Sequence, residues 1–133
     1  MEIKAEITDI KTYADKRASQ EVHTAIYRLK LPEGVDFQFK AGQFVQLSMD
    51  DFKLRGNPNM PKWTSYSICS AEGEKTGLEF AIRLLDTPGF TNHLKLNAKV
   101  GSQINVRGPM GVFTVKPDAK RLAYFCTGTG IAP

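Results

Sequence analysis

The sequence has few of the residues that build metal sites and disulfide frameworks. Its 133 residues include two histidines and two cysteines, Cys69 and Cys126, which lie far apart and in no Cys-x-x-Cys pair. This pattern excludes a zinc knuckle, an iron–sulfur cluster held by this chain alone and a disulfide scaffold. We therefore expect no metal site, and a reducing, cytoplasmic setting.

Long apolar runs and a strong charge of one sign are also missing. The apolar runs are too short for a membrane span, and residues 1–6 alternate charged and apolar side chains without a signal-peptide core. Eighteen basic and fourteen acidic residues give a net charge of +4. This mild excess favours acidic partners without requiring nucleic acid, and we expect none, because basic residues do not alternate with exposed aromatics along consecutive strands.

The chain does contain a succession of short strand patterns. Apolar and polar side chains alternate over residues 3–8, and further strands are predicted at 22–31, 44–49, 66–69, 78–85, 104–106 and 112–115, the last pairing with 104–106. Residues 13–20 and 50–62 are typical of polar connections, and one helix of about two turns is expected from Phe90. Short strands separated by turn signals predict an all-β, closed antiparallel barrel with one capping helix.

The last residues follow a different pattern. Residues 121–126 form an apolar run typical of a buried strand in a parallel sheet, and a glycine-rich turn follows at 127–133. A nucleotide-binding βαβ unit begins in this way, but the helix and second strand do not follow. We therefore expect a barrel domain over 1–117 and the start of a truncated nucleotide-binding domain over 118–133, in a chain cut from a longer protein.

Two segments have residue types suited to a cofactor. An aromatic ring and a hydroxyl at Tyr66 and Ser67 suit a flat conjugated ligand, although an ordinary strand with polar residues facing water has the same pattern. Gly89 and Thr91 precede or begin the helix, where free N–H groups suit a phosphate, although a plain surface helix also begins in this way. The segments 42–45 and 108–113 are equally consistent with a loop and a hairpin.

Taken in order, these segments resemble the FAD-binding domain of the ferredoxin–NADP⁺ reductase superfamily. The matching segments are Gly42-Gln43-Phe44-Val45, Tyr66-Ser67-Ile68-Cys69-Ser70, Gly89-Phe90-Thr91, Gly108-Pro109-Met110-Gly111-Val112-Phe113 and Gly128-Thr129-Gly130-Ile131-Ala132-Pro133. The resemblance covers nearly the whole chain. It implies a six-stranded antiparallel Greek-key barrel that holds FAD, or less often FMN, followed by the first strand and turn of an NAD(P)-binding domain.

The resemblance also implies roles for individual residues. Tyr66 would pack against the isoalloxazine, and Ser67, the catalytic residue, would reach flavin N5, which accepts hydride from NAD(P)H. The implied cofactor-binding residues are Thr64, Ser65, Tyr66, Ser67, Ile82, Arg83, Leu84, Gly89, Phe90 and Thr91. Those on the nicotinamide side are Thr127, Gly128, Thr129 and Gly130.

The chain departs from the family pattern at Thr64, where the family has an arginine that neutralises the pyrophosphate. A charge-assisted hydrogen bond contributes roughly 1.5–3 kcal/mol, so flavin binding should be weaker than is usual in the family unless Lys62 or Arg83 replaces that charge. The phosphate segment also has one residue fewer before its hydroxyl, Thr91.

The implied function is the flavin-binding domain of an NAD(P)H-dependent oxidoreductase or electron-transfer subunit. It would pass electrons to a protein or small-molecule acceptor, such as an acidic ferredoxin. We expect the chain to be inactive alone, because almost no nicotinamide site is present. The alternative is a flavin-free barrel that acts as a protein-interaction module. Three neighbouring residues have no assigned role: His93, expected at the surface, and Phe52 and Trp63, which would cover the adenine or pack on the barrel.

Overall fold

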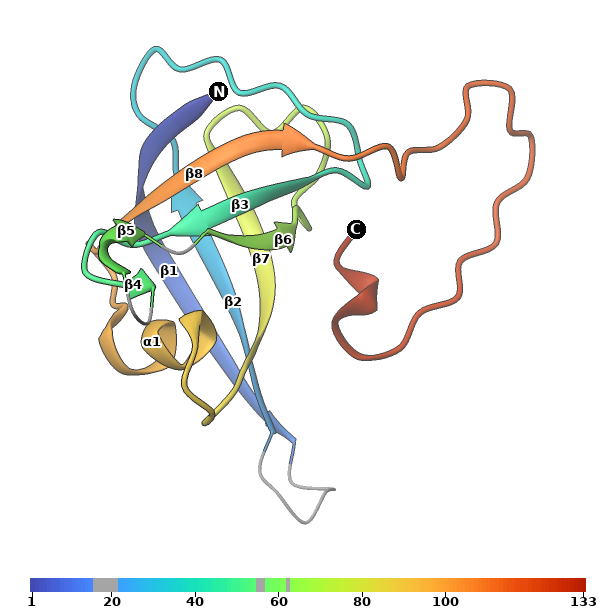
Figure 1. Ribbon diagram of the computed structural model, residues 1–133. Coiled ribbons are helices and arrows are strands. Elements are labelled where there is room, and N and C mark those ends of the chain that lie inside the picture. The colour runs from blue at the N-terminus through green and yellow to red at the C-terminus, as the bar shows by residue number, and fades with distance from the viewer. Residues whose placement is uncertain (16–21, 55–56, 62) are drawn as a thin grey trace.

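A computed structural model describes residues 1–15, 22–54, 57–61 and 63–133. Its main element is a six-stranded antiparallel sheet in the order β6-β3-β8-β1-β2-β7. The strands are β1 (Glu2–Asp15), β2 (Val22–Lys30), β3 (Phe44–Ser48), β6 (Thr64–Ser67), β7 (Gly77–Leu84) and β8 (Gln103–Met110). One α-helix, α1 (Phe90–Asn97), lies at one end of the sheet (Figure 1). The predicted all-β class with a single short helix is confirmed.

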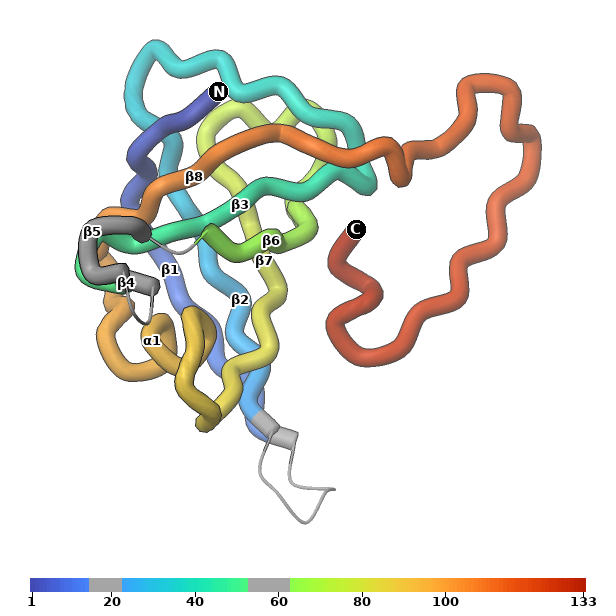
Figure 2. The backbone as a smooth tube through the Cα atoms, viewed as in Figure 1, coloured from blue at the N-terminus to red at the C-terminus, as the bar shows by residue number. Residues whose placement is uncertain are grey.

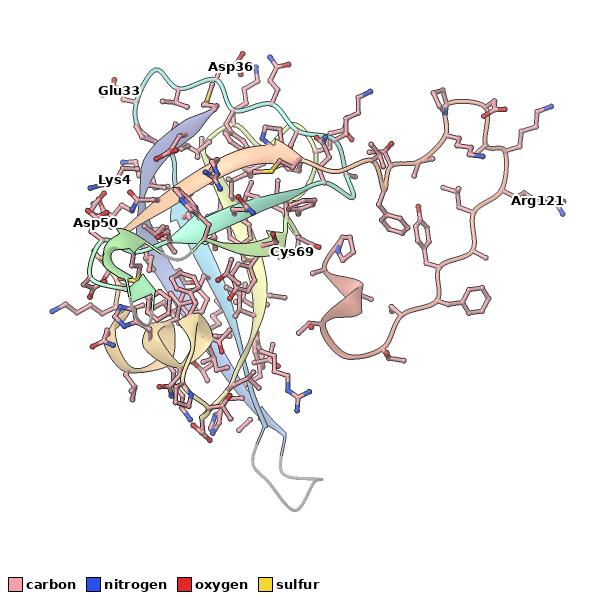
Figure 3. All side chains as sticks on the ribbon, in the orientation of Figure 1. Lys4, Glu33, Asp36, Asp50, Cys69 and Arg121 are labelled. Carbon is pink, nitrogen blue, oxygen red and sulfur yellow. The ribbon has the colours of Figure 1, made fainter. Side chains whose placement is uncertain are left out.

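The sheet curls so that its two edge strands approach each other (Figure 1). Just after β6, the Cys69 N–H donates to the carbonyl of Glu79 on β7 at 2.9 Å. Cys69 is labelled at this point in Figure 3. The site described below lies between these two strands.

The core consists of the apolar residues that alternate along the strands. On β7, Leu78, Phe80, Ile82 and Leu84 are all buried, as the two-residue period of a strand requires. The helix adds Phe90 and Leu94, four residues apart and therefore on one helical face.

Two segments predicted as polar connections contain strands. β1 extends to Asp15, which pairs with Val22 of β2, so residues 13–15 belong to a long hairpin, and residues 16–21 lie outside the described part of the chain. Within 50–62, β4 (Lys53–Leu54) and β5 (Asn57–Pro61) pair as a small second sheet. In both places backbone pairing with a neighbouring segment forms the strand without an alternating apolar pattern.

The strand predicted over 112–115 is wrong. β8 runs on to Met110, through a cis peptide bond between Gly108 and Pro109, and the next residues form an exposed, irregular segment. Val112 is 95% exposed. Both edges of β8 are already occupied, since it pairs with β1 on one side and with β3 on the other. No edge of β8 is left for residues 112–115.

The buried strand predicted over 121–126 is also wrong. This segment is irregular, and Phe125 is 96% exposed. The strands of a parallel sheet are buried on both faces, and no described strand or helix covers this segment. The backbone tube in Figure 2 shows this arm leaving the end of β8 and returning toward the sheet, where Gly128–Ile131 forms a 3₁₀ helix. No helix among the described residues is long and apolar enough to cross a membrane.

Candidate functional site

Two of the sequence motifs contact each other and stabilise the end of the sheet. The side-chain amide of Gln43 donates to the carbonyl of Gly111 at 3.1 Å. Gly42 has a φ of +93°, and a Cβ atom placed there would lie 1.7 Å from the carbonyl oxygen of Phe113. A Cβ on Gly111 would lie 2.9 Å from the ring of Phe44. Both glycines are therefore needed for close packing, and segments 42–45 and 108–113 form one structural unit rather than an independent loop and hairpin.

A cleft lies between β6 and β7. Its volume is about 590 Å³, including the solvent space at its mouth. The C-terminal 3₁₀ turn forms its third wall. Its lining residues are Ser65, Tyr66, Ser67, Ala81, Ile82, Arg83, Thr129 and Ala132. The structure thus brings together residues from three separate predicted site segments.

On β6, alternate residues face opposite sides of the sheet. Thr64 pairs with Leu47 of β3, and Tyr66 pairs with Val45. The hydroxyl oxygens of Thr64 and Tyr66 are both buried, and neither has a hydrogen-bond partner among the described residues. A buried hydroxyl without a partner costs about 1–3 kcal/mol, and such groups in native proteins often await a ligand or an ordered water.

Burial also fixes the protonation state of Tyr66. It raises the pKa of the Tyr66 hydroxyl above its ordinary value, with a smaller contribution from Tyr27. The group is therefore neutral at physiological pH and can donate one hydrogen bond. Its ring packs near Phe90, with the ring centroids 6.1 Å apart, so the start of α1 supports the wall of the cleft.

The predicted phosphate segment begins α1. Gly89 is the N-cap residue, and no side chain caps the helix, so backbone N–H groups of its first turn lack a side-chain partner. Apart from the neighbouring residues of the chain, the nearest described atom to a Cβ on Gly89 would be the Thr87 carbonyl oxygen at 4.0 Å. Packing within the chain therefore does not demand glycine, and room is left for a ligand. Phe90 is buried, so only its backbone can face a cofactor, and Thr91 is partly exposed.

Other predicted residues are divided between the cleft and the core. Ile82 and Arg83 line the cleft, although the Ile82 side chain is buried, whereas Leu84 is buried in the core and does not line the cleft. Of the predicted nicotinamide-side residues, Thr129 lines the cleft, and Thr127, Gly128 and Gly130 lie in the same turn without lining it. Sequence reasoning missed Ala81 and Ala132, because an alanine has no chemical group that marks a site.

The neighbouring aromatic residues pack on the barrel. Phe52 lies between Phe90 and His93, with ring centroids 5.3 Å and 5.0 Å away. His93, expected at the surface, is half-buried there: its side chain is 16% exposed, and its Nε2 lies 2.9 Å from an oxygen of the exposed Asp51 carboxylate. Trp63 lies beneath the guanidinium of Arg107, 4.4 Å from the ring centroid.

Comparison with known proteins is consistent with this geometry. Residues 11–115 match the family model of the oxidoreductase FAD-binding domain. The chain is 30% identical over 126 residues to the CDP-6-deoxy-L-threo-D-glycero-4-hexulose-3-dehydrase reductase of Yersinia pestis, covering 92% of this chain and 35% of that protein. It is 32% identical over 121 residues to methane monooxygenase component C of Methylosinus trichosporium, covering 90% and 33%.

Solved structures show the same fold. The ferredoxin reductase in carbazole 1,9a-dioxygenase superposes with a TM-score of 0.64 at 22% identity, covering 89% of this chain and 31% of that one. A ferredoxin NADP⁺ reductase from Neisseria gonorrhoeae with bound FAD and NADP superposes with a TM-score of 0.58 at 24% identity, covering 84% and 39%. The chain spans about a third of the length of the curated relatives it matches. From the family match over residues 11–115, this chain belongs to the oxidoreductase FAD-binding domain family.

Proposed function

We propose that this chain is the flavin-binding part of an NAD(P)H-dependent oxidoreductase, and that FAD occupies the cleft between β6 and β7. One observation carries the proposal: residues 65–67 on one strand and Ile82 and Arg83 on another, which the family resemblance marks for flavin binding, line one cleft. The unpartnered hydroxyl of Tyr66 in the same wall supports it. These residues fit a flat, hydrogen-bonding cofactor.

Each wall of the cleft has a distinct task in this proposal. The Tyr66 ring would pack against the isoalloxazine, and its neutral hydroxyl could donate a hydrogen bond to the cofactor. The Ser67 hydroxyl would reach flavin N5, and the backbone of β7 at 82–84 would follow the ribityl or adenosine side. The free N–H groups at 89–91 face the phosphates. When bound, FAD would accept hydride and pass electrons on, and the protein would orient the cofactor.

The names of the relatives support a proposal for the wider activity. Those compared include a dehydrase reductase and a monooxygenase component, and others are named as dioxygenase reductase components. We propose that NAD(P)H is the donor, that an acidic electron-transfer protein such as a ferredoxin is the acceptor, and that the setting is cytoplasmic. The division into a barrel over 1–117 and a nucleotide-binding start over 118–133 belongs to the same proposal. It is supported by the way the chain leaves the sheet after β8.

The role of Ser67 can be tested on the bound cofactor. Ser67→Ala should raise the Kd for FAD by about fivefold or less, because a neutral hydrogen bond contributes about 1 kcal/mol. It should shift the midpoint potential of bound FAD, since it removes the hydrogen bond at N5. Thr12→Ala, which removes an exposed hydroxyl from β1 outside the cleft, is the control. An unchanged potential in Ser67→Ala would refute the role of Ser67, and a chain that binds no FAD would favour the flavin-free interaction module.

A further inference from the structure

We propose that Arg83 is the residue that binds the flavin phosphate in this chain, in place of the arginine that Thr64 replaces. The inference rests on the proposed function, and it extends that function by naming the group that selects phosphorylated flavins. Sequence reasoning left two candidates for this charge, Lys62 and Arg83. Lys62 lies outside the described residues.

Thr64 is poorly placed to bind an anion. It does not line the cleft, although the three residues that follow it do. Its hydroxyl oxygen is buried without a partner among the described residues, and its backbone pairs with Leu47 of β3. A neutral hydroxyl also cannot offset the charge of a phosphate.

Arg83 is well placed to do so. It lies on β7 between two buried residues, Ile82 and Leu84, so the strand's alternation directs its side chain to the outer face. There it is exposed and lines the cleft opposite residues 65–67. No hydrogen bond or ion pair holds it among the described residues.

Other arginines of the sheet are already engaged. Arg28 makes ion pairs with Glu79 and Glu74. Arg107 donates to Gln46 and covers Trp63. Arg83 therefore differs from both in having a guanidinium that is open to a ligand.

The charge of the cleft favours an anion. Its described lining includes one arginine and no aspartate or glutamate. A guanidinium offers a planar set of N–H donors that matches phosphate oxygens in pairs. FMN and FAD carry phosphate, whereas riboflavin carries none, so the three flavins report this contact separately from ring binding.

The test compares the Kd values of FMN, FAD and riboflavin for the 133-residue chain and its variants. We expect the wild type to bind FMN about tenfold more tightly than riboflavin at low ionic strength, because one charge-assisted hydrogen bond at an exposed site contributes about that factor. The ratio of the riboflavin Kd to the FMN Kd should fall as salt is added. Arg83→Gln should lower this ratio several-fold and leave riboflavin binding unchanged, with the N–H groups at 89–91 retaining the remainder, whereas Arg83→Lys should lower the ratio less. Arg121→Gln is the matched control, because Arg121 is exposed on the C-terminal arm and points away from the sheet (Figure 3).

Three results would overturn the assignment. An unchanged FMN-to-riboflavin ratio in Arg83→Gln would show that the guanidinium does not bind the flavin phosphate. Loss of the ratio in Lys62→Gln alone would assign the charge to Lys62. Loss of NADP⁺ binding in Arg83→Gln with an unchanged flavin ratio would assign the guanidinium to the pyridine nucleotide. Binding of none of the three flavins would instead refute the proposed function itself, which distinguishes the two failures.

Discussion

Substitution of Gly42 by alanine tests whether the two contacting motifs are a packed structural unit. Two costs are expected at this position. An L-residue at a φ of +93° pays roughly 1–2 kcal/mol for a left-handed backbone. The new Cβ would also lie 1.7 Å from the Phe113 carbonyl oxygen, and displacing that backbone is an overpacking change that costs about 1–3 kcal/mol.

Gly101 provides a matched control for the backbone cost. Its φ is +92°, and no described atom lies within 4 Å of a Cβ placed there. Gly101→Ala therefore pays the backbone cost without the steric one. The smaller conformational freedom of the unfolded chain that alanine brings is similar in both variants and cancels in the comparison.

Urea unfolding measures the two variants under one set of conditions. Gly101→Ala should lower the free energy of unfolding by roughly 1–2 kcal/mol, and Gly42→Ala by at least about 1 kcal/mol more, at the same m-value. Equal losses in the two variants would refute the account, because they would show that residues 42 and 113 do not pack as described.

Three further predictions concern the site and its surroundings. Phe90→Ala should lower the free energy of unfolding by about 3–5 kcal/mol. Phe113→Ala, at a side chain that is 71% exposed, should change it far less. Similar losses for the two variants in a urea titration would contradict the packing of Phe90. Tyr66→Phe removes a buried hydroxyl without a described partner. It should stabilise the flavin-free chain by about 1 kcal/mol and weaken FAD binding several-fold. A variant that unfolds more easily than the wild type would show that the hydroxyl has a partner within the fold. Burial raises the pKa of Tyr27 to about 12 and also raises that of Tyr66. The folded chain therefore keeps protons that the unfolded chain loses near pH 10, so the free energy of unfolding should be at its full value below about pH 10 and fall between about pH 10 and 12. Urea midpoints that do not change over this range would contradict the burial of the two tyrosines.

The fold class could be predicted from the sequence because the core strands alternate strictly. Leu78, Phe80, Ile82 and Leu84 show the two-residue period without ambiguity, and all four are buried. The end of β1 could not be predicted in this way, since residues 11–15 alternate poorly and form a strand only through their pairing with β2.

The two wrong strands have a common cause. Apolar residues at 112–115 and 121–126 have strand composition, but a strand also needs a free neighbouring edge. β8 offers none to the first segment, and the second lies on an arm that runs away from the sheet, with no described strand beside it (Figure 2). Composition reports only the first of these two requirements.

The cleft could be located from the sequence only through the family resemblance. Taken alone, Tyr66 and Ser67 fit an ordinary strand equally well, and nothing in the pattern states that β6 and β7 lie side by side. The burial of the Thr64 and Tyr66 hydroxyls and the open position of Arg83 depend on how the sheet curls, which only the structure shows.

The central claim is that the cleft between β6 and β7 binds the flavin. The most direct measurement is a titration of the ¹⁵N-labelled chain with FAD, followed by backbone amide chemical shifts. The account predicts binding below about 100 µM, with the largest shifts at residues 65–67, 81–83 and 89–91. The absence of saturable shifts, or shifts concentrated at the distant depression lined by Lys4, Lys30 and Glu33, would contradict it.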